Sequence, residues 1–317
     1  MSRIHEALKK AEKERAAGRV SQDLESPLAT GSAVPPVSPE IPLAPGSMKT
    51  VSRANTRGDS RTHEYLRFED LSDRCQHPEW HPNANQNAFD PACPNAHCAE
   101  QFRTLRSRLY QMRSSQPLNR VLVTSAVPME GKTFVAHNLA RAIVRQPDQR
   151  ALIIDADLRL PRMHIALGAP SSPGLTDYLR GDASEIDVVQ HGTEGNLCFI
   201  PGGEQADEAS ELLSNGRLKT LLDRLAPVFE WIIVDSPPCL PVADANIIAE
   251  HCDGILLVVR AGFTPAETAM RARQELQARP VVGVVLNAVK EQKQYGMYYS
   301  AYGYGYGNNG SKNKGQK

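Results

Sequence analysis

The chain has 317 residues, and its 36 lysines and arginines are balanced by 36 aspartates and glutamates. At roughly 150 residues per domain, this length fits one large α/β domain with extensions or two small domains, and it excludes a disulfide-stapled miniature. A formal net charge of zero excludes a protein that coats nucleic acid through its overall charge, so we expect no nucleic-acid partner.

The first 95 residues differ in composition from the rest of the chain. Residues 1–17 carry apolar side chains at the i, i+3, i+4, i+7 spacing of one helix face, which predicts an amphipathic helix that docks on a partner; a charged helix without a partner is the alternative. Residues 18–95 are rich in proline, serine and alanine and poor in large apolar residues, which predicts a disordered linker. The linker contains one small apolar cluster able to pack on another element, namely Tyr65, Leu66, Phe68 and Leu71.

The end of the predicted linker is rich in side chains that bind soft metals. The paired Cys-x2-Cys and His-x3-His arrangement of familiar zinc modules does not appear cleanly among them, because no Cys-x2-Cys accompanies the two histidines. We therefore interpret this stretch as polar linker and not as a zinc site. The side chains concerned are Cys75, His77, His81, Cys93, His97 and Cys98.

Residues 96–290 have the composition of a globular domain. A helix is predicted near residues 97–113, and after it short apolar runs alternate with helix-length intervals. Runs that are apolar on both faces predict a mostly parallel sheet with helices on both faces, an α/β fold. Residues 291–317 are rich in glycine and tyrosine and are predicted to form a flexible tail. The predicted strands are residues 120–125, 151–155, 197–200, 231–235, 254–260 and 281–286.

The first predicted strand leads into the segment AVPMEGKT, residues 126–133, and then into an apolar helix. This order suits a phosphate-binding loop, because backbone N–H groups and a helix N-terminus surround the anion, Lys132 reaches the β- and γ-phosphates, and the Thr133 hydroxyl binds Mg²⁺. Ala126 stands where the strict motif has its first glycine. The motif by itself therefore leaves a plain strand–turn–helix open.

Acidic residues follow two further strands. Asp155 and Asp157 come at the end of one buried strand, and Asp235 comes at the end of another. The carboxyl ends of parallel strands meet at one edge of the sheet, which is where open α/β folds bind ligands, and carboxylates there can hold Mg²⁺ directly or through water. Together with the Gly-Lys-Thr loop, they predict a nucleotide-binding site.

These motifs resemble those of the bacterial tyrosine autokinases (BY-kinases) of capsule and exopolysaccharide synthesis. The resemblance covers about residues 96–306, and it implies a P-loop NTPase fold of deviant Walker, MinD/ParA-like architecture with its kinase domain at 96–290. It also implies ATP-dependent protein-tyrosine kinase activity. The segments that carry it are VTSAVPMEGKT, LIIDADLRLPRMH, GLTDYLRG, SELL, WIIVDSPP and VVGVVLNAV, followed by the tyrosine-rich tail.

The resemblance implies the site residues, with ATP and Mg²⁺ as cofactors. Lys132, Asp155 and Asp157 are the expected catalytic residues, and Asp155 is our choice over Asp157 as acceptor of the tyrosine proton. Thr133, Asp157 and Asp235 are expected at the metal. The residues expected to bind the nucleotide are Met129, Glu130, Gly131, Lys132, Thr133, Phe134 and Asp235.

The resemblance further implies phosphorylation between subunits of a homo-oligomeric ring, an octamer by family precedent. Glu100, Arg103 and Arg106 share one face of the helix near 97–113. Such a pattern is by itself typical of a solvated, salt-bridged surface, but in the family this helix packs on the neighbouring subunit. The expected autophosphorylation sites are Tyr295, Tyr298, Tyr299, Tyr302, Tyr304 and Tyr306.

No apolar run approaches the 18 or more residues of a membrane helix, and the N-terminus lacks the apolar region of a signal peptide. We therefore expect a cytoplasmic protein whose cysteines are reduced. The resemblance implies a separate transmembrane activator of the chain-length-determinant type, which recruits the kinase to the inner face of the plasma membrane, and an opposing protein-tyrosine phosphatase. The expected role is to regulate exopolysaccharide or capsule polymerisation and export.

The alternative is a nucleotide-switched ATPase scaffold without kinase activity, related to the partition and septum-site ATPases. Those proteins carry a signature lysine at the position of Val127, which this chain lacks. The tyrosine cluster of the tail also argues against this alternative.

Overall fold

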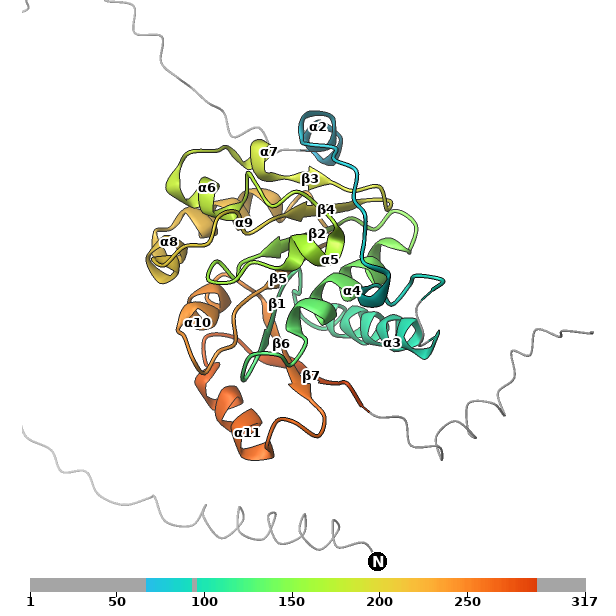
Figure 1. Ribbon diagram of the computed structural model, residues 1–317, viewed down its shortest axis with the longest axis vertical. Coiled ribbons are helices and arrows are strands. Elements are labelled where there is room, and N and C mark those ends of the chain that lie inside the picture. The colour runs from blue at the N-terminus through green and yellow to red at the C-terminus, as the bar shows by residue number, and fades with distance from the viewer. Residues whose placement is uncertain (1–66, 93–95, 290–317) are drawn as a thin grey trace, which may run out of the picture. The chain divides into compact units, whose positions relative to one another are not determined.

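The computed structural model describes residues 67–92 and 96–289. They form a seven-stranded sheet in the order β3-β4-β2-β5-β1-β6-β7, with helices on both faces (Figure 1). Every neighbouring pair is parallel except β3 and β4, so the predicted α/β fold is confirmed. Within the described residues, no helix has the length and hydropathy needed to cross a membrane.

The strands agree closely with the runs predicted from the sequence. The first five predicted runs are strands with the predicted bounds, and the sixth extends one residue further. β3 has only two residues, too few to give a hydrophobic pattern, and it was not predicted. The strands are β1 (Arg120–Ser125), β2 (Ala151–Asp155), β3 (Gln190–His191), β4 (Leu197–Ile200), β5 (Trp231–Asp235), β6 (Gly254–Arg260) and β7 (Val281–Asn287).

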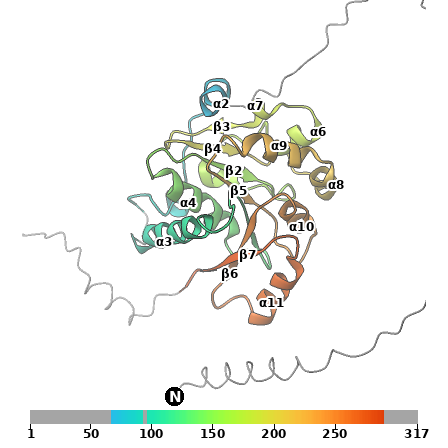
Figure 2. The ribbon, with the colours of Figure 1, turned by 180° about the vertical axis from the view of Figure 1, so that it is seen from behind.

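Helices cover both faces of the sheet because the central strands are buried on both sides. One face is covered by α3 (Ala96–Arg113), α4 (Lys132–Val144) and α5 (Met163–Leu167), and the predicted helix near 97–113 is α3. The opposite face is covered by α6 (Leu175–Arg180), α7 (Glu185–Val188), α8 (Ala209–Ser214), α9 (Arg217–Leu225), α10 (Asp244–Ala249) and α11 (Ala266–Glu275). Figure 2 shows α6, α8 and α10 across the sheet from α3 and α4.

Residues 67–92, which we call the strap, are folded against this domain. The strap contains α2 (Phe68–Arg74) and the short 3-10 helix η1 (Ala84–Gln86). Phe68 and Leu71 are buried in one core, and Trp80, 5% exposed, is buried in the other. The Trp80 ring lies edge-on to Phe199, with centroids 6.1 Å apart.

Residues 67–92 belong to the predicted linker, 18–95, but in the structure they are folded against the domain. Composition averaged over a long polar stretch hides the few large apolar residues that anchor it, two of which, Phe68 and Leu71, belong to the small apolar cluster of the linker. Cys75, one of the potential metal ligands, is buried in the apolar core. The remainder of the predicted linker, the 1–17 helix and the 291–317 tail lie outside the described residues.

The strand order places the predicted site. β5 lies between β1 and β2, and Asp155 at the end of β2 is in register with Asp235 at the end of β5. The phosphate-binding loop leaves the end of the adjacent strand β1. The three segments thus meet at one edge of the sheet, as the parallel arrangement requires.

Candidate active site

The loop 126–131 between β1 and α4 has the backbone shape of an anion-binding loop. Gly131 precedes α4 in a left-handed conformation, with φ of 92°, and no side chain caps the helix. A Cβ at Gly131 would lie 2.0 Å from Asn287 Nδ2, so only glycine fits both the conformation and the space. The uncapped N–H groups and the positive end of the helix dipole are free to bind phosphate.

Glu130 fixes the shape of this loop. Its carboxylate is 1% exposed, and it accepts hydrogen bonds from the backbone N–H of Val127 at 2.7 Å and of Arg260 at 3.3 Å, and from the Thr264 hydroxyl. These bonds join the phosphate-binding loop to the segment that follows β6. The side chain of Glu130 is therefore occupied within the protein, whereas the neighbouring side chain of Met129 is 79% exposed.

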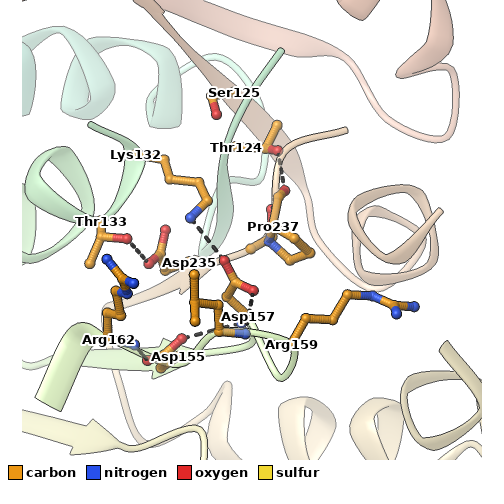
Figure 3. A network of polar contacts seen from close by, with 12 residues as sticks. Thr124, Ser125, Lys132, Thr133, Asp155, Asp157, Arg159, Arg162, Asp235 and Pro237 are labelled. Carbon is orange, nitrogen blue, oxygen red and sulfur yellow. Dashed lines mark hydrogen bonds and ion pairs between the residues drawn. The ribbon is translucent and has the colours of Figure 1, made fainter. Parts of the chain in front are cut away.

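Lys132 and Thr133 each contact an acidic residue from another strand (Figure 3). Lys132 Nζ lies 2.9 Å from Asp157 Oδ2, and the Thr133 hydroxyl donates to Asp235 Oδ2 at 2.6 Å. Burial lowers the pKa of Lys132, but the surrounding carboxylates, Asp235 foremost, outweigh it and raise this pKa above its usual value. The lysine therefore stays charged in a buried position, as phosphate binding requires.

Asp155 is held by the loop that follows it. Its carboxylate accepts from the backbone N–H groups of Asp157, Arg162 and Met163 at 3.2, 3.1 and 3.0 Å. It is buried, and burial followed by repulsion from Asp235 raises its pKa to about 8. Burial also raises the pKa of Asp235, to about 6, although the charge of Lys132 opposes this.

The residues at this edge fit Mg²⁺. Asp235 Oδ1 is buried and has no hydrogen-bond partner within the described part of the chain, while Oδ2 of the same carboxylate accepts from the Thr133 hydroxyl. Hard oxygen donors of this kind are the ligands that Mg²⁺ takes, usually with only one or two from carboxylates. The structure thus offers an unsatisfied carboxylate oxygen next to the hydroxyl that the sequence motif assigns to the metal.

Arg159 forms a partly buried network that the sequence analysis did not predict. Its Nε and Nη2 donate to the two carboxylate oxygens of Asp244 at 2.7 and 3.2 Å, and Nη2 also donates to the Ser210 hydroxyl at 3.0 Å. Ser210 in turn donates to Asp244 at 2.6 Å. This network ties the loop after Asp157 to the beginning of α10. Its only sequence signal is an arginine two residues after the paired aspartates.

Some predicted residues lie elsewhere. The Phe134 ring packs edge-on against Phe102 of α3 at a centroid distance of 5.8 Å, so only its backbone can face a nucleotide. On α3, Arg103 pairs with Glu100 at 2.8 Å on the surface, whereas Arg106 donates to the Ala142 carbonyl of α4 at 2.6 Å. Arg106 thus binds within its own chain. The six tail tyrosines lie outside the described residues.

Comparison with known proteins identifies relatives that match more than half of the chain. The chain is 35% identical over 209 residues to the Bacillus subtilis tyrosine-protein kinase YwqD, an alignment that covers 65% of this chain and 88% of YwqD. It is also 35% identical over 198 residues to the Escherichia coli tyrosine-protein kinase etk, but there it spans only 27% of the relative. No family model matches the chain.

Solved structures agree with the sequence relatives. The kinase domain of Escherichia coli ETK superposes with a TM-score of 0.61 and 31% identity, covering 69% of this chain and 84% of that domain. The BceF tyrosine kinase domain gives a TM-score of 0.58 at 27% identity, covering 68% of this chain and 93% of that one. These relatives favour a kinase over the ATPase scaffold. With its P-loop fold and site, the chain belongs to the bacterial tyrosine-protein kinase family.

Proposed function

We propose that this chain transfers the γ-phosphoryl group of ATP to tyrosine, with the tyrosines of its own tail as acceptors. The observation that carries the proposal is the meeting of Lys132 and Thr133 with Asp157 and Asp235, at 2.9 and 2.6 Å, at the mouth of an uncapped helix. The family membership supports a phenolic acceptor. The tail supplies six tyrosines within residues 295–306.

In this reaction the bond between the γ-phosphorus and the oxygen bridging to the β-phosphate breaks, and a bond forms between that phosphorus and the tyrosine oxygen. The N–H groups of loop 126–131 and the Lys132 ammonium stabilise the charge on the transferred group, which is the main source of acceleration in phosphoryl transfer. Thr133 and Asp235, with Asp157, would hold Mg²⁺, which when bound neutralises charge on the phosphate oxygens.

The tyrosine proton passes to a carboxylate of the site. We propose Asp155 as the acceptor, since a pKa raised to about 8 brings its basicity closer to that of a phenol with a pKa near 10. Its three backbone N–H donors hold the carboxylate in a fixed orientation. Asp157, 7% exposed against 1% for Asp155 and next to Lys132, is the competing group, and substitution of each aspartate in turn distinguishes the two.

We further propose that the tail of one subunit reaches the site of the next in a homo-oligomeric ring, such as an octamer, with Glu100 and Arg103 on the contacting helix. Both side chains are solvent-accessible and paired with each other, so a neighbouring chain can contact them. A separate transmembrane activator would recruit the kinase to the plasma membrane, a phosphatase would reverse the reaction, and the cycle would regulate exopolysaccharide or capsule export.

The test uses one variant chain as the kinase and another as the phosphate acceptor. A Lys132→Met chain serves as acceptor only, and a chain with all six tail tyrosines changed to phenylalanine serves as donor only. Incubated together with ATP, Mg²⁺ and a cytoplasmic activator fragment, they yield phosphotyrosine at 295–306 of the Lys132→Met chain by mass spectrometry. Unmodified tyrosines in that mixture contradict transfer between chains, and an unmodified wild-type tail contradicts the kinase proposal.

Asp155→Asn and Asp157→Asn donors decide the proton acceptor. Asp155→Asn should lower the rate of transfer at saturating ATP and remove the alkaline-shifted limb of its pH profile, because the acceptor is lost. Asp157→Asn should instead weaken the use of Mg²⁺ and ATP while keeping that limb. The reverse pattern assigns the proton to Asp157.

A further inference from the structure

The strap runs along the domain and contacts the two helices that follow the nucleotide-binding loops. After α2, the strap backbone pairs with β3, because Gln76 N–H donates to the Val189 carbonyl at 3.1 Å and His191 N–H donates to the Gln76 carbonyl at 2.7 Å. Trp80 then fills the space beside Gly192, where a Cβ would lie 2.3 Å from the indole ring. These contacts anchor the middle of the strap far along the sheet from β1.

The strap next crosses α5. The N–H groups of His81 and Asn83 donate to the carbonyls of Gly168 and Ala166 at 3.1 and 3.2 Å. The approach is close, since a Cβ at Gly168 would lie 1.9 Å from the His81 carbonyl oxygen. α5 follows directly on the loop whose N–H groups bind Asp155, so the strap is attached one helix away from that carboxylate.

The strap ends on α4. Asn138, which is fully buried, accepts from the Ala88 N–H at 2.8 Å and donates to the Gln86 carbonyl at 2.9 Å. The neighbouring His137 has its two ring nitrogens 2.7 Å from the Gln86 carbonyl oxygen and 2.8 Å from the Thr133 carbonyl oxygen. Burial lowers the pKa of His137, so the ring is neutral and its single N–H donates to only one of these two carbonyls. The imidazole therefore packs between the strap and the first turn of α4.

Together, these contacts of the strap fix the distance between α4 and α5. α4 begins with Lys132 and Thr133, and α5 is joined to Asp155 and Asp157 through the intervening loop. A nucleotide with its metal would lie between these groups. A segment fastened by hydrogen bonds to both helices limits how far they can move apart, and a site held in its productive geometry binds with a smaller ordering cost.

We propose that Asn138 is a positioning residue, and that through it the strap holds the phosphate-binding loop and the Asp155–Asp157 loop at the spacing that a nucleotide requires. This inference rests on the proposed function, because it names a residue that supports the same site. It assigns to residues 67–92 a role in nucleotide binding that they exert through α4 and α5, and not through a contact of their own with the nucleotide.

The experiment measures binding of ADP with Mg²⁺ to the full chain by fluorescence titration. Asn138→Ala leaves the Ala88 N–H without its acceptor and removes one of the two side chains that contact the Gln86 carbonyl. We expect the affinity to fall about tenfold, within the usual range of couplings between linked sites. Trp80→Ala loosens the strap at a distance from both loops and should also weaken binding severalfold. Trp80→Phe should restore it, because the ring is kept and the indole N–H has no partner to lose.

The control is Leu221→Ala on α9, a fully buried residue in the opposite core. It should destabilise the fold by as much or more, yet leave ADP affinity within twofold of wild type. If the strap strengthens ADP binding, ADP must in turn stabilise the strap. Amide hydrogen exchange at Asn83 and Ala88 should therefore slow when ADP binds to wild type, and should not slow in Asn138→Ala.

The outcomes separate this inference from the proposed function. If wild type binds ADP while Asn138→Ala and Trp80→Ala bind it equally well, the positioning role is refuted and the kinase proposal stands. A loss in Leu221→Ala equal to that in Asn138→Ala also refutes it, because lower stability would then explain both. If wild type itself does not bind ADP with Mg²⁺, both the proposed function and this inference fail.

Discussion

The buried carboxylate of Glu130 offers a direct test of how the phosphate-binding loop is held. Glu130→Gln keeps the size of the side chain and removes its charge. The amide oxygen can still accept from the Val127 N–H, and the amide N–H₂ can donate to the Thr264 hydroxyl, which turns to accept. The substitution therefore keeps two short hydrogen bonds but removes the charge that strengthens both of them.

The expected cost follows from these contacts. A hydrogen bond to a charged group contributes about 1.5–3 kcal/mol and one between neutral groups about 0.5–1.5 kcal/mol, so each of the two bonds weakens by about 1–1.5 kcal/mol. The long contact to the Arg260 N–H, 3.3 Å, adds little. We expect Glu130→Gln to lower the free energy of unfolding by about 2–3 kcal/mol, and Glu130→Ala to lower it further because every acceptor is gone.

Urea unfolding measures this change as a shift of the midpoint at constant slope. The matched control is Glu204→Gln, which makes the same chemical change at an exposed position and should stay within about 0.5 kcal/mol of wild type. If Glu130→Gln were as stable as Glu204→Gln, the carboxylate would not hold the loop, and the loop would owe its shape to its backbone alone.

Three other predictions follow from the same site. Met129 has a φ of 67°, a left-handed conformation that is strained for any residue with a Cβ. Measured by urea unfolding, Met129→Gly should raise the free energy of unfolding by about 1 kcal/mol, whereas Met129→Ala, which keeps the strain, should not. Arg159→Lys keeps the charge but cannot bond both oxygens of buried Asp244, and it should cost about 1–3 kcal/mol by thermal unfolding; an unchanged midpoint would contradict a structural role for that network. Burial raises the pKa values of both Asp155 and Asp235, so binding of Mg²⁺ and nucleotide beside them should release protons. Affinity should therefore rise from pH 6 to 8, and calorimetry in buffers of different ionisation enthalpy should detect the release; a heat independent of the buffer would refute it.

The strands and the nucleotide motifs were predictable because each is a local pattern. A buried parallel strand is a continuous apolar run, and the runs at 120–125 and 231–235 end where β1 and β5 end. Motif residues that follow such strands are placed at one edge by the parallel order alone, which is why Lys132 and Asp157 could be predicted to meet.

Contacts between distant segments could not be predicted in this way. Asp244 lies 85 residues after Arg159, and no periodicity connects them. For the strap, the sequence indicated only that the small apolar cluster with Phe68 and Leu71 can pack on another element. Trp80 was missed because it is an isolated apolar residue in a polar stretch, and composition describes averages. Phe134 was predicted to bind the nucleotide because it lies next to the motif, but its ring packs on Phe102. A position beside a motif does not determine which way a side chain points.

The two margins of the sheet differ in their capacity to recruit a further strand. At the β3 margin the strap already occupies the backbone groups through Gln76, whereas β7 pairs only with β6 among the described residues and carries Val284 and Leu286 at 60% and 58% exposure. An unpaired edge of this kind is a template for another chain. Because the strap already pairs with the opposite margin, β7 is the edge that the described residues offer, and strand addition there would join molecules in pairs.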